Sequence, residues 1–287
     1  MSDSHLIYSY EEIASRAEQV REIFRNKNVP LHAESSLSKL LREATRLAKE
    51  WKEGVKDGSI QRLMMAVYAN RISEAIISSG NDPEANECFR RMSRGEMNLA
   101  MRPRSEGKDA LWEIELFAWL KKRGIPVRMM DPPDLVIDIG FGDYPIACKK
   151  IYSEKGVEAQ MRKGVAQLEP FNKMGIVAFD ISDLTPEGTI LNSQSESAVS
   201  DFLFDLNREF IERHQPKIQR FISENRCDGI LVTTSVLTDI QSMRPQFNDH
   251  SQKTLWSLSS KSSDASNRLD ALADKLQVHR PQLAVLK

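Results

Sequence analysis

The sequence predicts an α/β protein in which an N-terminal helical bundle is followed by a mixed β-sheet flanked by helices. Apolar residues recur at helical spacing until a polar, basic segment at residues 94–108. A helix then leads into short β-rich runs, with another helix between the third and fourth runs. A helix, three antiparallel strands, a crossover helix and a further strand make a mixed α/β layer. We therefore divide the chain into a helical module (1–104), an α/β domain (105–240) and a polar tail with a late helix (241–287).

The composition indicates a protein of the reducing cytoplasm. Of the 287 residues, 40% are hydrophobic, and no apolar run approaches the roughly 20 residues that a membrane-spanning helix needs. The N-terminal segment lacks the basic and apolar regions of a secretion signal. The three cysteines (Cys88, Cys148 and Cys227) are far apart, which argues against a disulfide framework and against a zinc site. The net charge of −1 means that any binding of nucleic acid depends on a local patch.

The helical module contains four predicted helices. Ser9 and Glu12 form a capping-box pattern at the start of the first helix, which ends before Pro30. The second and third helices run from about Ser36 to Gly54 and from about Ser59 to Gly80, and a short fourth helix follows Pro83. Their apolar stripes are explained by packing within a bundle. A homodimer contact or a protein partner on these helices is the alternative.

The α/β domain begins with a helix at about 109–123. Strands are predicted at 127–130, 135–139, 144–151 and 175–181, with a helix at 153–171 between the last two. A long helix from about Ser195 is expected to end at Pro216, because proline interrupts helical hydrogen bonding. A fifth strand is predicted at 229–234. The serine-rich tail is expected to contain one helix, at about 269–276.

Two adjacent strands bring together residues suited to phosphodiester chemistry. Alternation along the strand at 144–151 turns Ala147 and Lys149 to one face, with Ile146 and Cys148 toward the core. If the strands pair through the turn at 140–142, Asp134 lies near Lys149. Hydrolysis with metal ions uses hard oxygen ligands and a cation that stabilises the developing charge.

The flanking helices add further candidates. Glu113 belongs to a helix that is apolar on most sides, so its carboxylate must be paired, metal-bound or exposed at one edge. On the next helix, Gln160, Gly164 and Gln167 lie on one stripe.

The segment Trp112–Leu168 resembles the PD-(D/E)xK nuclease superfamily, whose fold is restriction-endonuclease-like. Glu113 matches the helix acid, Asp134 the aspartate of the PD element, and Lys149 the lysine. The resemblance implies cleavage of DNA that depends on Mg²⁺ or Mn²⁺, with Asp134 and Glu113 as metal ligands. It implies that Lys149 stabilises the attacking hydroxide, and that Gln167 or Gln160 orients water or a ligand.

The sequence departs from the family pattern at Ala147, where the second carboxylate would stand. Either another acid supplies the ligand (Glu113, Glu115 or Asp138), or the fold has lost catalysis and serves as a scaffold that binds nucleic acid or protein. In a third alternative the alignment is shifted by one residue, so that Cys148 and Lys150 face the site. This alignment is less favoured because it makes the ligand face apolar.

DNA is the expected partner. The basic residues Lys150, Lys155, Arg162 and Lys163 lie close to the matched segment and are candidates for phosphate contacts. The same residues are also typical of a solvated surface, so this assignment is a hypothesis.

Overall fold

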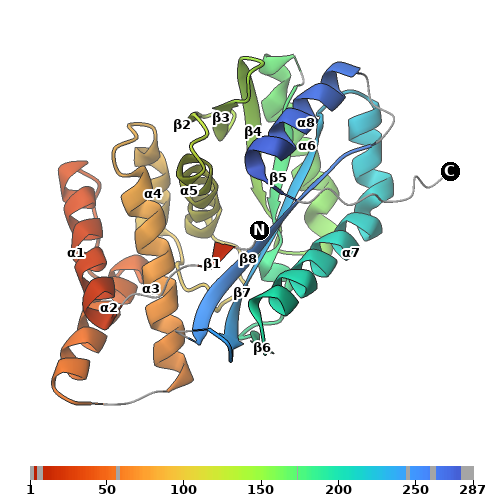
Figure 1. The fold of residues 1–287 in the computed structure, drawn as a ribbon. Helices are drawn as coiled ribbons and strands as arrows, with labels where there is room; N and C mark the ends of the chain where they lie inside the picture. The colour runs from red at the N-terminus through yellow and green to blue at the C-terminus, as the bar shows by residue number, and fades with distance from the viewer. Residues whose placement is uncertain are drawn as a thin grey trace.

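A computed structural model describes residues 3–4, 9–55, 59–172, 174–243, 246–258 and 263–278. It confirms an α/β protein with an N-terminal helical region and a mixed, curved sheet flanked by helices (Figure 1). Within the described residues, no helix combines the length and the apolar character needed to cross a membrane.

The N-terminal region contains α1 (Tyr10–Asn26), α2 (Ser36–Lys52), α3 (Ile60–Ser79) and α4 (Ala85–Arg94). The predicted capping box is present: the Ser9 hydroxyl accepts from the Glu12 amide, and the Glu12 carboxylate accepts from the Ser9 amide. α1, α2 and α3 bury apolar faces against one another, as their stripes predict.

The matched segment folds in the expected order. It comprises α5 (Glu106–Lys122), β2 (Val127–Met129), β3 (Leu135–Asp138), β4 (Asp143–Lys150), the short 3₁₀ turn η1 (Glu154–Gly156), α6 (Val157–Leu168), the turn η2 (Glu169–Phe171) and β5 (Ile176–Asp180). Strands β2, β3 and β4 are antiparallel, and β5 lies parallel to β4 after the α6 crossover.

The remaining elements complete the sheet and cover it. They are the turn η3 (Ser182–Leu184), β6 (Ile190–Ser193), α7 (Glu196–Ser223), β7 (Gly229–Ile240), β8 (Phe247–Trp256) and α8 (Ser263–Leu276), while β1 (Asp3–Ser4) pairs with β8. The strand order is β1-β8-β7-β5-β4-β3-β2, and β6 pairs with β7.

Two expectations from the sequence are wrong. The segment expected to be a polar tail contributes β8, a long antiparallel partner of β7 whose side chains are all buried. The long helix does not end at Pro216 but continues to Ser223. Pro216 is exposed, whereas Ile218, Phe221 and Ile222 are buried, so packing beyond the proline offsets the hydrogen bond that it removes.

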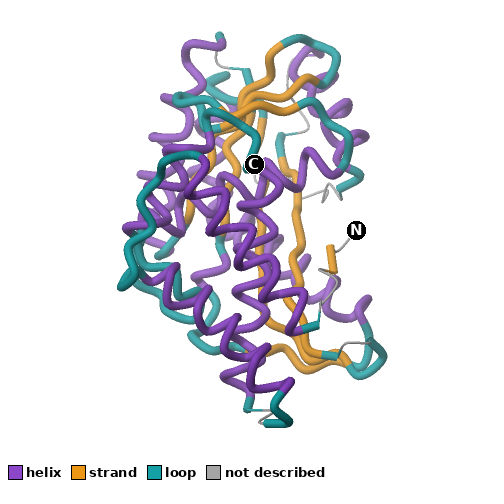
Figure 2. Tube along the Cα trace, turned by 90° about the vertical axis from the view of Figure 1, so that its left-hand side faces the viewer, coloured by secondary structure: helices purple, strands orange, loops and turns teal. Residues whose placement is uncertain are grey.

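The sheet separates two apolar layers. On one face, α5 and the N-terminal helices share a single core that includes Ile146 and Cys148 of β4. On the other face, α6 and α7 pack over Ala147, Val177 and Phe179. In Figure 2, seen from the side of the N-terminal helices, these helices lie in front of the long strands. The helical region is therefore part of the protein's main core.

Candidate functional site

Asp134 occupies the centre of the candidate site, immediately before β3. Because Leu135 pairs with Ile146, Asp134 falls opposite Ala147 at the end of the β3–β4 ladder. Its Oδ2 accepts from the Cys148 amide at 2.5 Å and from Lys149 Nζ at 3.1 Å. The expected proximity of Asp134 and Lys149 is therefore observed, in a place where Asp134 is only 8% exposed.

Gln167 reaches the same aspartate from α6. Its Nε2 donates to Asp134 Oδ1 at 3.4 Å, whereas its Oε1 is buried without a hydrogen-bond partner among the described residues. The helix can approach because Gly164 has no side chain: a Cβ there would lie 2.7 Å from a Val177 methyl. Of the two glutamines considered from the sequence, Gln167 is the one with this contact.

Glu113 approaches from α5, on the opposite face of the sheet. Arg91 of α4 donates to both of its carboxylate oxygens, at 2.9 and 3.0 Å, and the Cys88 thiol donates to Oε2. Burial raises the pKa of Glu113 to about 7, and the negative charge of Asp134 adds to the shift. Glu113 is thus electrostatically coupled to Asp134, while its hydrogen bonds go to the helical region.

Ala147 stands at the position where the resemblance expects a second carboxylate. It is fully buried in the apolar layer beneath α6, on the face predicted from the alternation. Neither of the other proposed replacement acids is available. Glu115 is held by Arg71, and Asp138, at the far end of β3, accepts from the Gly140 amide in the hairpin.

The donor set does not fit a hydrolytic Mg²⁺ or Mn²⁺ site. Such ions take several oxygen ligands, and the two candidate carboxylates already accept from Lys149 and Arg91. Within the described part of the chain, no group of three or more His, Cys, Asp or Glu side chains is placed to hold a metal ion. The expectation that Asp134 and Glu113 share one ion therefore stays a prediction, and an ion there would have to displace Lys149 and Arg91 from these carboxylates.

The candidate phosphate-binding residues divide into two groups. Lys155, Arg162 and Lys163 are exposed, on η1 and α6. Lys150 is only 8% exposed, and its ammonium is paired with Asp180 and Asp183, so it is not available to a phosphate. This corrects its assignment as a nucleic-acid contact.

Lys150 belongs to a buried charge network that was not predicted from the sequence. Lys108 of α5 donates to Asp183 at 3.1 Å, beside the Lys150–Asp180 pair. Burial would raise the pKa of Asp180, but the adjacent Lys150 ammonium holds it below its usual value. The sequence did contain one signal for this network: Asp180 lies at the carboxyl end of a buried strand. Polar groups often lie together at that end of parallel strands.

Comparisons with protein-family models, with curated proteins and with solved structures found no match for this chain.

Proposed function

We propose that this protein is a catalytically lapsed, restriction-endonuclease-like protein that binds nucleic acid without cleaving it. The observation that carries the proposal is the contact among Asp134, Lys149 and Gln167, combined with Ala147 where a third ligand is needed. Buried charges persist when they are paired and hydrogen-bonded. Here Asp134 is paired with Lys149 and Glu113 with Arg91, which suits a structural role better than metal binding.

The surface of α6 supports the choice of nucleic acid as the ligand. Lys163 is exposed on α6, the helix that carries Gln167, and Lys155 is exposed on the preceding turn η1. Arg162 of α6 is 66% exposed and lies 3.4 Å from Glu158. Flexible, solvated cations contact phosphates without reading the base sequence. The proposal therefore predicts modest, salt-dependent binding with little sequence preference.

Two assays test the proposal. Plasmid and single-stranded DNA are incubated with the protein and Mg²⁺ or Mn²⁺, and we expect no cleavage by the wild type. Binding of a fluorescent DNA duplex is followed by anisotropy across a salt series. Changing Lys155 and Lys163 together to alanine should weaken binding and reduce the salt slope by about 2, because each lysine is expected to neutralise one phosphate.

A matched control uses two lysines of α2. Lys39 and Lys49 have side chains that are 58% and 75% exposed, so their double alanine variant removes the same charge elsewhere. Equal loss of binding in both double variants would show that net charge, and not the α6 surface, determines affinity. Absence of binding at low salt would overturn the proposal.

Metal-dependent hydrolysis of DNA is the second candidate, favoured by the contact between Asp134 and Lys149. It requires a ligand set other than Asp134 and Glu113 alone. Metal-dependent nicking that disappears in Asp134→Ala would establish it and would overturn the lapsed-nuclease proposal.

A further inference from the structure

A pocket of about 320 Å³ lies between the N-terminal helices and the start of β8. Described residues of α1, α2, α3 and β8 line it, and its volume is within the range of small-molecule sites. None of these residues belongs to the Asp134 site or to α6. The pocket is therefore separate from the surfaces to which the proposed function assigns a role.

Most of the pocket wall is apolar. Its described aromatic residues are Tyr10, Trp51 and Phe247, and its aliphatic residues are Ile13, Leu63, Ala66 and Val67. Trp51 is 47% exposed whereas Phe247 is 8% exposed, so the aromatic wall extends from the surface into the interior. The rings of Tyr10 and Trp51 contact each other, with centres 5.4 Å apart, which holds the outer part of the wall in place. Such a wall favours a ligand with a flat apolar part.

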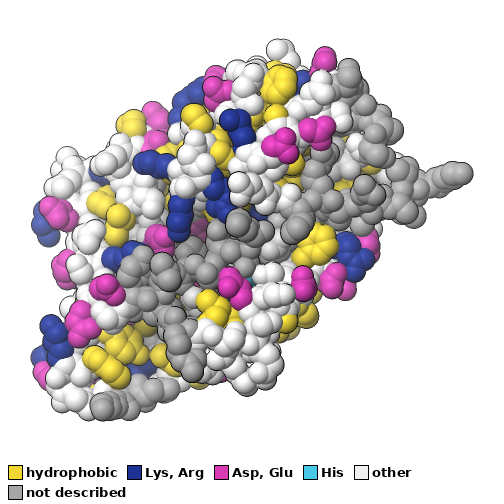
Figure 3. Space-filling view, viewed as in Figure 1, with side chains coloured by type: hydrophobic (Ala, Val, Ile, Leu, Met, Phe, Trp, Pro, Cys, Tyr) yellow, Lys and Arg dark blue, Asp and Glu magenta, His cyan; other side chains and the backbone are white. Residues whose placement is uncertain are grey.

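The outer part of this wall belongs to a larger apolar surface. In Figure 3, apolar side chains are exposed at the lower end of the helical region, where α2 leads to α3 in Figure 1. Val55 and Ile60, which lie in the chain between Trp51 and the first turn of α3, are 44% and 52% exposed. Exposed apolar surface of this kind often marks a binding site.

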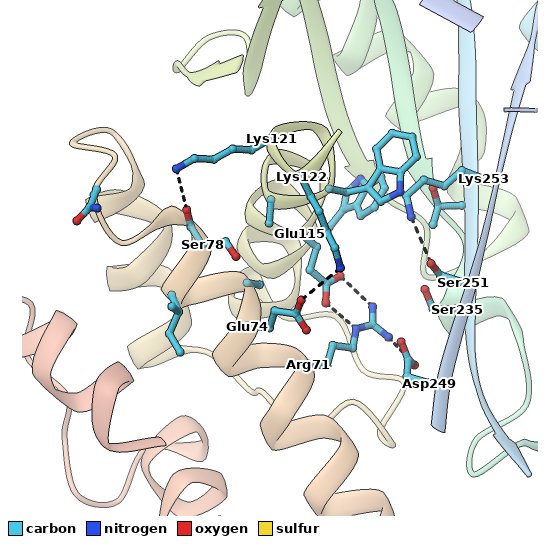
Figure 4. A pocket seen from close by; sticks show the side chains of 17 residues that line it. Arg71, Glu74, Ser78, Glu115, Lys121, Lys122, Ser235, Asp249, Ser251 and Lys253 are labelled. Atoms are coloured by element: carbon cyan, nitrogen blue, oxygen red, sulfur yellow. Dashed lines mark hydrogen bonds and ion pairs between the residues drawn. The ribbon is translucent and has the colours of Figure 1, made fainter. Parts of the chain in front are cut away.

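Arg71 lines the pocket but is not available to a ligand anion. Its guanidinium contacts Glu115 at 2.6 Å and Asp249 at 3.1 Å, as the dashed lines of Figure 4 show from the neighbouring pocket. Among the described residues of the wall, Arg71 is the one basic side chain, whereas Glu11 and Asp249 are acidic. The charges therefore favour a cationic ligand over an anionic one.

Two oxygen acceptors of the wall are uncommitted among the described residues. The Glu11 carboxylate, in the first turn of α1, makes no hydrogen bond or ion pair with them. Asn70 of α3 is 4% exposed, and its Oδ1 is buried without a hydrogen-bond partner. The terminal torsion of an amide side chain is soft, so Asn70 can turn this oxygen toward the pocket. A ligand that supplies hydrogen-bond donors would satisfy both groups.

An acidic side chain is also favourable at the start of a helix, so Glu11 by itself does not define a site. The buried oxygen of Asn70 is a separate observation, because it lies on another helix and has no such explanation. Both observations, together with the aromatic wall, require the same chemistry of a ligand: an apolar body with donor protons.

We propose that this pocket binds a hydrophobic amine, with its apolar body against Trp51 and Phe247 and its nitrogen donors toward Glu11 and Asn70. An ammonium group donates hydrogen bonds and carries a charge opposite to that of Glu11. Aromatic faces also attract cations. The proposal goes beyond the proposed function, because it involves neither Asp134 nor the surface of α6.

Isothermal titration of the full chain with tryptamine, tryptophol and indoleacetate at neutral pH tests the proposal, because these molecules share one ring system and differ in charge. Tryptamine should bind, and the neutral tryptophol should bind at least about tenfold more weakly, because it lacks the charged donor. Indoleacetate should bind more weakly still, since its carboxylate would meet Glu11. Absence of binding by tryptamine and by the smaller phenethylamine at millimolar concentration overturns the proposal, as does binding of indoleacetate as tight as that of tryptamine.

Variants locate the ligand. Glu11→Gln keeps the side-chain length and removes the charge, and should weaken tryptamine binding about tenfold while leaving tryptophol binding unchanged. Asn70→Leu removes the buried acceptor and should weaken the binding of both ligands severalfold. If that variant does not fold, Trp51→Ala, at a half-exposed position, removes part of the apolar wall and should have the same effect. Unchanged tryptamine affinity in Glu11→Gln and Trp51→Ala overturns the assignment of the site.

Glu22→Gln is the matched control. Glu22 is exposed on the same helix and does not line the pocket, so this variant removes the same charge at another place on α1. It should bind tryptamine as the wild type does. A loss equal to that of Glu11→Gln would show that net charge determines the affinity, and would overturn the assignment.

Discussion

Asp134 and Lys149 form a partly buried ion pair, with 3.1 Å between Oδ2 and Nζ. The aspartate precedes β3 and the lysine lies on β4, and the same oxygen accepts from the Cys148 amide. The pair therefore joins the neighbouring strands β3 and β4 where their ladder ends. A metal ion at Asp134 would have to compete with a cation and an amide of the chain itself.

A carboxylate placed at position 147 should create metal affinity. In Ala147→Glu the new side chain leaves β4 on the face of Lys149, opposite Asp134. We expect Mn²⁺ binding by calorimetry in this variant and none in the wild type, because two adjacent carboxylates then face one ion.

Ala147→Gln is the control for that experiment, since it has the same shape without the charge. The folding of both variants should be checked by circular dichroism, because position 147 is fully buried in an apolar layer. Mn²⁺ binding by the wild type as tight as that of Ala147→Glu would contradict the prediction.

The raised pKa of Glu113 predicts a stability that falls as pH rises. Burial, with the charge of Asp134, raises this pKa from 4.5 to about 7, so the folded state holds the proton more tightly than the unfolded state. The resulting stabilisation is complete below pH 4.5 and is lost as pH rises through 7. The difference is roughly 3 kcal/mol.

Urea unfolding between about pH 4.5 and about pH 8 measures this dependence. Glu113→Gln should flatten the curve, because the amide does not titrate. If the variant retains the same dependence as the wild type, other groups are responsible and the assignment to Glu113 fails.

The Lys150–Asp180 pair should respond asymmetrically to mutation. Lys150→Met leaves a buried carboxylate without its main partner and should destabilise the fold by about 3–5 kcal/mol. Adding Asp180→Asn removes that charge and should recover much of the loss. Chemical denaturation of the single and the double variant measures this recovery of stability. A double variant no more stable than Lys150→Met would contradict the prediction.

Close packing of α6 on β5 should make Gly164→Ala unfavourable. Alanine gains about 1 kcal/mol of helix propensity, but its Cβ would lie 2.7 and 2.9 Å from the methyl groups of Val177, a stiff, fully buried side chain. We expect net destabilisation of about 1–3 kcal/mol. Combining it with Val177→Ala should cost less than the sum of the single changes in thermal unfolding, whereas additivity would exclude the clash.

Replacing Pro216 by alanine should stabilise the protein. The proline lies inside α7 on its exposed side, where it removes a helical hydrogen bond. We expect a gain of about 2 kcal/mol in unfolding free energy. Lys217→Ala, at the next exposed position, should change stability by less than about 0.5 kcal/mol. An unchanged melting temperature in Pro216→Ala would show that α7 already accommodates the proline.

Patterns among residues close together in the sequence determined many of the secondary-structure elements of this protein. Helical stripes and the Ser9 capping box predicted the N-terminal helices, and alternation predicted that Ala147 and Cys148 face opposite sides of the sheet. These features depend on neighbours a few residues apart, so the sequence alone contains them. The contact between Asp134 and Lys149 was also accessible, because one short hairpin joins their strands.

Two features were decided only by the tertiary structure. One is the burial of the polar strand β8, and the other is which cation pairs with each acidic side chain. β8 is buried although it carries Asp249, Gln252 and Lys253, because its partners come from distant elements. Arg71 of α3 pairs with Asp249, and Asn207 of α7 donates to the Gln252 carbonyl. Buried polar groups are stable only when such partners exist, and long-range pairing has no local signature. For the same reason the sequence could nominate Glu113, but only the fold assigned its carboxylate to Arg91.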